Sequence, residues 1–140
     1  FAAFLLLKEL MKIGLDYGGV ISFAPDGWAN TIAIAKSRGH QIYLISHAQK
    51  GEDLQIRRNY ADMLGITDLS FADLISASQE PEIARRKAEL CQEHGIEIFI
   101  DDDLHRAEAV GRMCNRCAAL YIPQNLWQVG QRLIEGLDSD

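Results

Sequence analysis

Several classes of protein are disfavoured by what this 140-residue sequence has little of: cysteine, positive charge and long apolar runs. Its three cysteines are an odd number, and no secretion signal accompanies them, which indicates free thiols in a reducing compartment. The 14 basic residues are outnumbered by 20 acidic ones, and the net charge of −6 argues against a broad nucleic-acid-binding face. We therefore expect a cytoplasmic protein whose partner is not a nucleic acid.

The apolar run at the start of the sequence does not predict a membrane anchor. FAAFLLL ends at Leu7, whereas a helix needs about 20 apolar residues to span a bilayer. The run also lacks the basic start and the cleavage site of a signal peptide. Met11 followed by Lys12 makes a natural beginning, so we treat residues 1–10 as an extension of undetermined origin and 11–140 as a single domain. A folded extension would be a short apolar helix and a contact in a homo-oligomer.

Two expected motifs are missing as well. No G-x-G-x-x-G follows the first predicted strand, which argues against a dinucleotide-binding Rossmann domain. Cys114 and Cys117 form a C-x2-C, but neither a second pair nor a histidine cluster accompanies them. Packed thiols are therefore favoured over a zinc site.

What the sequence does contain is an alternation of strand-like and helix-like segments. The predicted strands are 12–16, 41–46, a short piece near 73–76, 96–101 and 118–122. The predicted helices are 27–38, capped by Asp26 and stopped by Gly39, then 52–64, 81–94, 104–113 and 125–136. This order predicts an α/β fold of three layers, a Rossmann-like central parallel sheet with helices on both faces.

Polar side chains follow three of these predicted strands. Asp16, Ser46 and Asp101 each stand at a carboxyl end, which is where parallel sheets carry their sites. Asp102 and Asp103 come next, and acids gathered in a partly dry cleft repel one another unless a cation is present. The triplet therefore favours metal binding, with Asp103 as the cap of the following helix.

Lys87 stands on the apolar face of a predicted helix. It shares that face with Ile83 and Leu90 at helical spacing, and the face should point at the sheet, a poor place for an unpaired ammonium. Reaching the acidic strand ends would resolve this conflict. The alternatives are a lysine that snorkels to solvent, or Arg85 or Arg86 in the same role.

Taken together, these segments resemble four motifs of the haloacid-dehalogenase-like (HAD) superfamily. DYGGV at 16–20 is similar to the first motif, in which the leading aspartate is a nucleophile. The strand ending in Ser46 resembles the second motif, Lys87 the third, and FIDDD at 99–103 the fourth. The stretch 87–102 is especially similar to small nucleotidase-like members.

The resemblance implies a Mg²⁺-dependent phosphohydrolase that forms an aspartyl-phosphate on Asp16. Ser46 and Lys87 would then hold the phosphoryl oxygens. The implied Mg²⁺ ligands are Asp16, the backbone carbonyl of Gly18, and Asp101 or Asp102. The implied substrate-binding residues are Gly18, Gly19, Ser46, His47 and Lys87.

The sequence departs from the family pattern in two ways. Family phosphatases usually carry a second aspartate two positions after the nucleophile, and here that position is Gly18. The loss of a general acid is worth about 10²–10⁴ in rate, so a second hypothesis is a HAD-like protein that binds a phosphorylated ligand or partner without turnover. The spacing of the motifs also leaves no room for a sizeable cap domain. Capless relatives act on phosphorylated macromolecules or use a neighbouring subunit as a lid, so the substrate is a small phosphorylated metabolite or a phosphorylated macromolecule.

A third hypothesis comes from the string GLDYGG, which also resembles the first strand of ribonuclease-H-like folds. Those folds continue from that strand into a β-hairpin. Here a Pro-Asp-Gly turn and a predicted helix follow, which argues against a nuclease of that type.

Overall fold

A computed structural model describes residues 10–48, 52–64, 68–73 and 80–137 of the chain. The five strands are β1 (Lys12–Leu15), β2 (Gln41–Ala48), β3 (Asp68–Asp73), β4 (Ile98–Asp101) and β5 (Ala118–Tyr121). The helices are α2 (Pro25–Ser37), α3 (Glu52–Met63), α4 (Glu80–His94), α5 (Leu104–Met113) and α6 (Trp127–Glu135), with short turns η1 (Tyr17–Ile21) and η3 (Gln124–Leu126).

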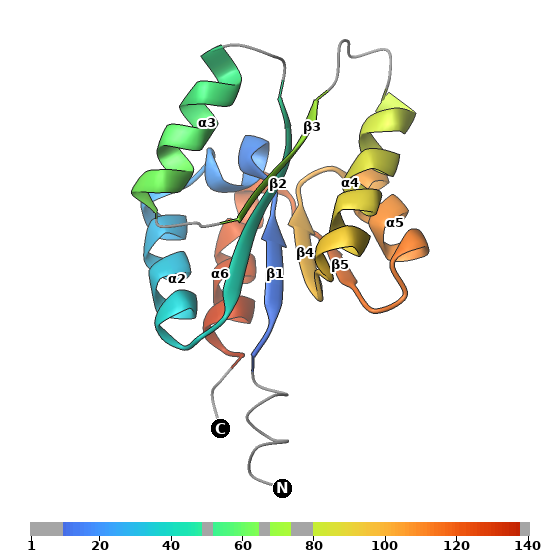
Figure 1. The fold of residues 1–140 in the computed structure, drawn as a ribbon. Coiled ribbons are helices and arrows are strands. Elements are labelled where there is room, and N and C mark those ends of the chain that lie inside the picture. The colour runs from blue at the N-terminus through green and yellow to red at the C-terminus, as the bar shows by residue number, and fades with distance from the viewer. Residues whose placement is uncertain (1–9, 49–51, 65–67, 74–79, 138–140) are drawn as a thin grey trace, which may run out of the picture.

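The strands form one sheet in the order β3-β2-β1-β4-β5, and all four pairings are parallel (Figure 1). The chain runs outward from β1 to β3 on one side and then returns to build β4 and β5 on the other. The direction of winding reverses between β1 and β4, and a crevice opens at the carboxyl ends of strands at such a point. The predicted α/β fold, with a parallel sheet covered on both faces, is confirmed.

Alternate residues of β2 and β4 enter two separate apolar cores. Ile13 and Leu15 of β1 pack on one face with Trp28 of α2 and Ile134 of α6. The opposite face packs against α4 and α5, through residues that include Tyr43, Ile45, Ala88, Phe99 and Val110. Because side chains alternate along a strand, residues two apart point to the same layer.

Two local predictions differ from the structure. The described third strand runs over Asp68–Asp73 and so begins before the predicted piece near 73–76, most of which lies outside the described residues. Its sequence DLSFAD has no uninterrupted apolar run, and its pairing with β2 fixes its place. Asp26 does not cap α2: the helix begins at Pro25, with Ala24 before it and no side-chain cap. The fixed φ of proline and its missing N–H suit a first helical position.

No described helix is both long enough and apolar enough to cross a membrane. In the described part of the chain, no further domain interrupts the path from β1 to α2. β1 is followed by α2 and pairs in parallel with β2, so the hairpin of a ribonuclease-H-like fold does not form there. Residues 1–9, which hold nearly all of the predicted extension, lie outside the described residues.

Candidate active site

The carboxyl ends of β1 and β4 bring two buried acids together. Asp16 follows β1 directly, and its backbone N–H donates to the Ile100 carbonyl at 3.1 Å, which extends the pairing with β4. Asp101 is the last residue of β4. Asp16 is 2% exposed and Asp101 is fully buried. Gly14 and Phe99, two positions earlier, face the α4 layer, so both carboxylates point toward α4 as well.

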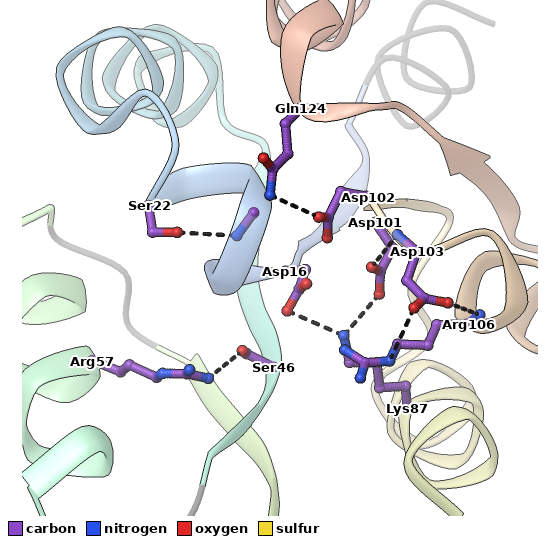
Figure 2. A network of polar contacts seen from close by, with 11 residues as sticks. Asp16, Ser22, Ser46, Arg57, Lys87, Asp101, Asp102, Asp103, Arg106 and Gln124 are labelled. Atoms are coloured by element: carbon purple, nitrogen blue, oxygen red, sulfur yellow. Dashed lines mark hydrogen bonds and ion pairs between the residues drawn. The ribbon is translucent and has the colours of Figure 1, made fainter. Parts of the chain in front are cut away.

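Lys87 of α4 reaches both of these acids. Its Nζ lies 2.7 Å from Asp101 Oδ2 and 3.1 Å from Asp16 Oδ1 (Figure 2). Its side chain is fully buried, so the prediction that it reaches the strand ends is confirmed. Arg85 and Arg86 are exposed and pair with Glu89 of their own helix.

The three consecutive acids after β4 have different contacts. Asp101 accepts a hydrogen bond from the Asp103 backbone N–H at 3.0 Å. Asp103 caps α5, as predicted, by accepting from the Arg106 backbone N–H at 3.1 Å. The Asp102 carboxylate turns toward Asp16 and accepts from Gln124 Nε2 at 3.2 Å (Figure 2).

Burial dominates the ionisation of this cluster. It raises the pKa of Asp101 to about 7, with the charge of Asp16 acting in the same direction and Lys87 opposing both. Burial and Asp16 also raise the pKa of Asp102, against a hydrogen bond from Gln124. Burial lowers the pKa of Lys87, but the charges of Asp16 and Asp101 outweigh it, and that pKa is raised overall. Lys87 therefore stays charged, and the repulsion from Asp16 contributes to the raised pKa of Asp101 and of Asp102.

This ionisation predicts how stability changes with pH. Because the pKa of Asp101 is raised to about 7 in the folded state, the folded state binds protons between about pH 4 and 7 that the unfolded state does not. The free energy of unfolding should therefore fall as pH rises through that window. Urea unfolding in EDTA at several pH values measures the slope. Asp101→Asn should remove most of it, and an unchanged slope in that variant would contradict the assignment.

The turn after β1 brings the chain against Asp102. Gly19 has a φ of +81°, a left-handed conformation that favours glycine. A Cβ at this position would overlap the Asp102 carboxylate. Its neighbour Gly18 has an ordinary extended backbone, with φ −68° and ψ 121°. Glycine is therefore favoured at position 19 for two reasons: the left-handed backbone conformation, and the close approach of the Asp102 carboxylate.

The residues of the site fit a divalent cation. Asp16, Asp101 and Asp102 each offer a carboxylate oxygen within 4.8 Å of the others, and this is the only such group of metal-ligating side chains in the described parts of the chain. With all three carboxylates ionised, as in a metal-bound site, the acids and Lys87 would carry a formal charge of two minus. Asp16 Oδ1 is buried and, despite its distance of 3.1 Å from Lys87 Nζ, makes no hydrogen bond. An all-oxygen set of this kind suits Mg²⁺.

Ser46 and an arginine that the sequence analysis missed flank Asp16 on the β2 side. Ser46 is fully buried, and its Oγ accepts from Arg57 Nη1 of α3 at 2.7 Å (Figure 2). The Arg57 guanidinium lies over the Tyr17 ring, 5.1 Å from its centroid. Gln124, the partner of Asp102, was missed as well. Neither Arg57 nor Gln124 belongs to a motif. Gln124 does follow the carboxyl end of β5, the edge of the sheet at which a site is expected, and its position could have indicated a role.

The remaining predicted residues are placed by the backbone alone. Gly18 lies two positions after Asp16, in the η1 turn. His47 continues β2 beyond Ser46 and pairs with Ala72, but its side chain lies outside the described part of the structure. Their predicted contacts with substrate stay predictions.

A cavity of about 520 Å³ at the opposite end of the sheet contains the three cysteines. Cys114 is buried and its Sγ donates to the Ala88 carbonyl at 3.2 Å. Burial raises the pKa of Cys91, and it raises that of Cys117 to about 12. Protonated thiols are poor nucleophiles and poor metal ligands, so the chemistry of the chain is expected at the acidic end of the sheet.

No protein-family model matches the chain, and no curated protein matches it. The fold is similar to that of an uncharacterised protein from Corynebacterium glutamicum, with a TM-score of 0.67 and 14% identity over 94% of this chain and 98% of that one. A universal stress protein in complex with cAMP has a TM-score of 0.46 and 12% identity, over 82% of this chain and 98% of that one. The first similarity supports the α/β fold alone, and the second is too low to carry an argument.

Proposed function

We propose that the chain is a Mg²⁺-dependent phosphohydrolase of the HAD type that acts on phosphate monoesters or related phosphoryl compounds in the cytoplasm. The observation that carries this proposal is the buried Asp16 carboxylate, paired with Lys87 and facing Asp101 and Asp102 at the ends of two neighbouring strands. The substrate would be a small phosphorylated metabolite or a phosphorylated macromolecule. A second subunit would serve as the lid, since the described part of the chain contains no cap domain.

Each residue of the site has its own role in the proposed reaction. Asp16, the carboxyl-terminal neighbour of β1, attacks phosphorus and becomes an aspartyl-phosphate. Lys87 and Ser46 hold the phosphoryl oxygens on either side of it, and water then attacks phosphorus and regenerates the carboxylate. Asp16, Asp101, Asp102 and the Gly18 carbonyl would hold Mg²⁺, which supplies positive charge for the phosphoryl oxygens. Gln124 and Gly19 keep Asp102 turned toward the site.

The proposal is tested with p-nitrophenyl phosphate, whose leaving group needs little help from an acid. We expect phosphate release with Mg²⁺, none with EDTA, and none from Asp16→Asn, because an amide cannot act as the nucleophile. Asp62→Asn, an exposed acid of α3, is the matched control and should keep the wild-type rate. Release that survives in Asp16→Asn would contradict the proposal.

Gly18 favours a second candidate, a protein that binds a phosphorylated ligand without turnover. Here Mg²⁺ and inorganic phosphate would raise the melting temperature of the wild type but not of Asp16→Asn, and no substrate would be hydrolysed.

A further inference from the structure

The position that lacks an acid is occupied from the other side by a guanidinium. A Cβ built at Gly18 would have Arg57 Nη2 as its nearest neighbour, at 4.0 Å. The other terminal nitrogen of the same group, Nη1, donates to Ser46 Oγ at 2.7 Å. The Arg57 guanidinium therefore contacts Ser46, which we expect to hold the phosphoryl group, and also lies beside Gly18. By the resemblance to HAD phosphatases, the leaving group would depart beside Gly18.

A chain of aromatic contacts helps to hold the guanidinium in this place. It stacks over the Tyr17 ring at 5.1 Å from the centroid, and Tyr17 in turn packs edge-on against Tyr60 of α3 with ring centroids 5.6 Å apart. The Tyr60 hydroxyl donates to the Pro25 carbonyl at 3.0 Å. Arg57 of α3 is thus held against the η1 turn. This restraint reduces the conformational entropy that its side chain loses when it binds an anion.

A guanidinium and a carboxylic acid help different leaving groups. Arginine stays charged at any ordinary pH and cannot hand over a proton. An alkoxide needs that proton, so an alkyl phosphate gains little from arginine. A phosphate or carboxylate leaves as a stable anion, and arginine binds such anions through two parallel N–H donors.

We propose that the substrate is an anhydride of phosphoric acid, with phosphate or a carboxylate as the leaving group, and that Arg57 binds this leaving anion. This inference rests on the proposed function. An Asp16 oxygen bonds to phosphorus, the bond from phosphorus to the bridging oxygen breaks, and its electron pair leaves on that oxygen without a proton. Water then attacks phosphorus and the Asp16 carboxylate departs. One proton of the water stays on the released phosphate and the other passes to solvent.

The first test compares kcat/KM with Mg²⁺ for pyrophosphate, acetyl phosphate, glycerol 2-phosphate and p-nitrophenyl phosphate. The anhydrides should exceed the alkyl ester by about 10²-fold or more, the usual worth of a general acid. Pyrophosphate and acetyl phosphate distinguish a phosphate leaving group from a carboxylate. Arg57→Gln should slow the preferred anhydride about 10²–10³-fold, as for the removal of a donor to a developing anion, and p-nitrophenyl phosphate much less. Arg58→Gln, one residue away and exposed, is the matched control and should keep both rates.

The second test puts the missing acid back. Gly18 has an ordinary backbone, and the nearest neighbour of an added Cβ is Arg57 Nη2 at 4.0 Å. Gly18→Asp should therefore fold, but Arg57 would lower the pKa of the new carboxyl and keep it ionised. We expect Gly18→Asp alone to leave glycerol 2-phosphate hydrolysis slow, and Gly18→Asp combined with Arg57→Gln to raise it about 10²-fold.

The outcomes separate the two proposals. Release from p-nitrophenyl phosphate without a preference for anhydrides, or an equal loss on all substrates in Arg57→Gln, overturns the inference and leaves the proposed function standing. No release from any substrate overturns both.

Discussion

Lys87→Met is expected to lower the free energy of unfolding in EDTA by about 3–5 kcal/mol, the usual effect of removing one partner from a buried ion pair. Lys87 is fully buried between Asp16 and Asp101, at 3.1 and 2.7 Å. Methionine fills a similar volume, so the loss comes from two buried carboxylates that face each other without a cation. Phosphate release should also fall to the background level.

Urea unfolding of wild type and variant measures the stability, and Arg86→Met provides the control on the same helix. Arg86 is exposed and pairs with Glu89 of its own helix, so its replacement should change the free energy of unfolding by less than about 0.5 kcal/mol. Adding Asp101→Asn to Lys87→Met should recover part of the loss, because one of the two unpaired charges is removed. A loss below about 1 kcal/mol in Lys87→Met would show that the buried pair does not stabilise the fold.

Gly19→Ala is expected to weaken Mg²⁺ binding about 10–100-fold, the range found when a metal ligand loses its orienting neighbours. A Cβ on Gly19 would overlap the Asp102 carboxylate. That carboxylate is the end of a movable side chain, so it should turn away from Asp16 and lose its hydrogen bond from Gln124. The left-handed φ of +81° adds about 1–2 kcal/mol of backbone strain.

Isothermal titration with Mg²⁺ measures the affinity, and Gly18→Ala is the control one residue away. Gly18 has a φ of −68° and no neighbour nearer than 4.0 Å to an added Cβ, so its alanine variant should fold with wild-type stability and keep the position of Asp102. Equal Mg²⁺ affinities in the two variants would argue against Asp102 as a ligand.

The sequence was informative where a short-range pattern determines direction. Asp16 and Asp101 could be placed because each ends a short apolar strand, and alternation along the strand then points both toward α4. Lys87 could be placed because its neighbours at helical spacing are apolar and buried. An ammonium on that face needs an anionic partner, and the acids at the strand ends provide it.

The parts that could not be predicted depend on how distant segments pack. Arg57 reaches Ser46 only because α3 lies beside the β1 turn, and nothing in the local sequence fixes that position. Gln124 meets Asp102 after the chain has crossed β5. The edge strand β3 was misplaced for the same reason, since its bounds come from pairing with β2.

The place of β1 in the middle of the sheet also governs when the site can exist during synthesis. Ile13 pairs with Ile42 on one side and Ile98 on the other, partners that are 42 − 13 = 29 and 98 − 13 = 85 residues away. At about 5–20 residues per second, β1 waits roughly 4–17 seconds for its second neighbour. Asp16 and Lys87 can be buried together only after β4 has been made. A nascent chain that ends before residue 98 therefore lacks both the complete charge cluster and the β4 neighbour of β1. Until β4 is made, β1 is an edge strand whose backbone can pair with another chain.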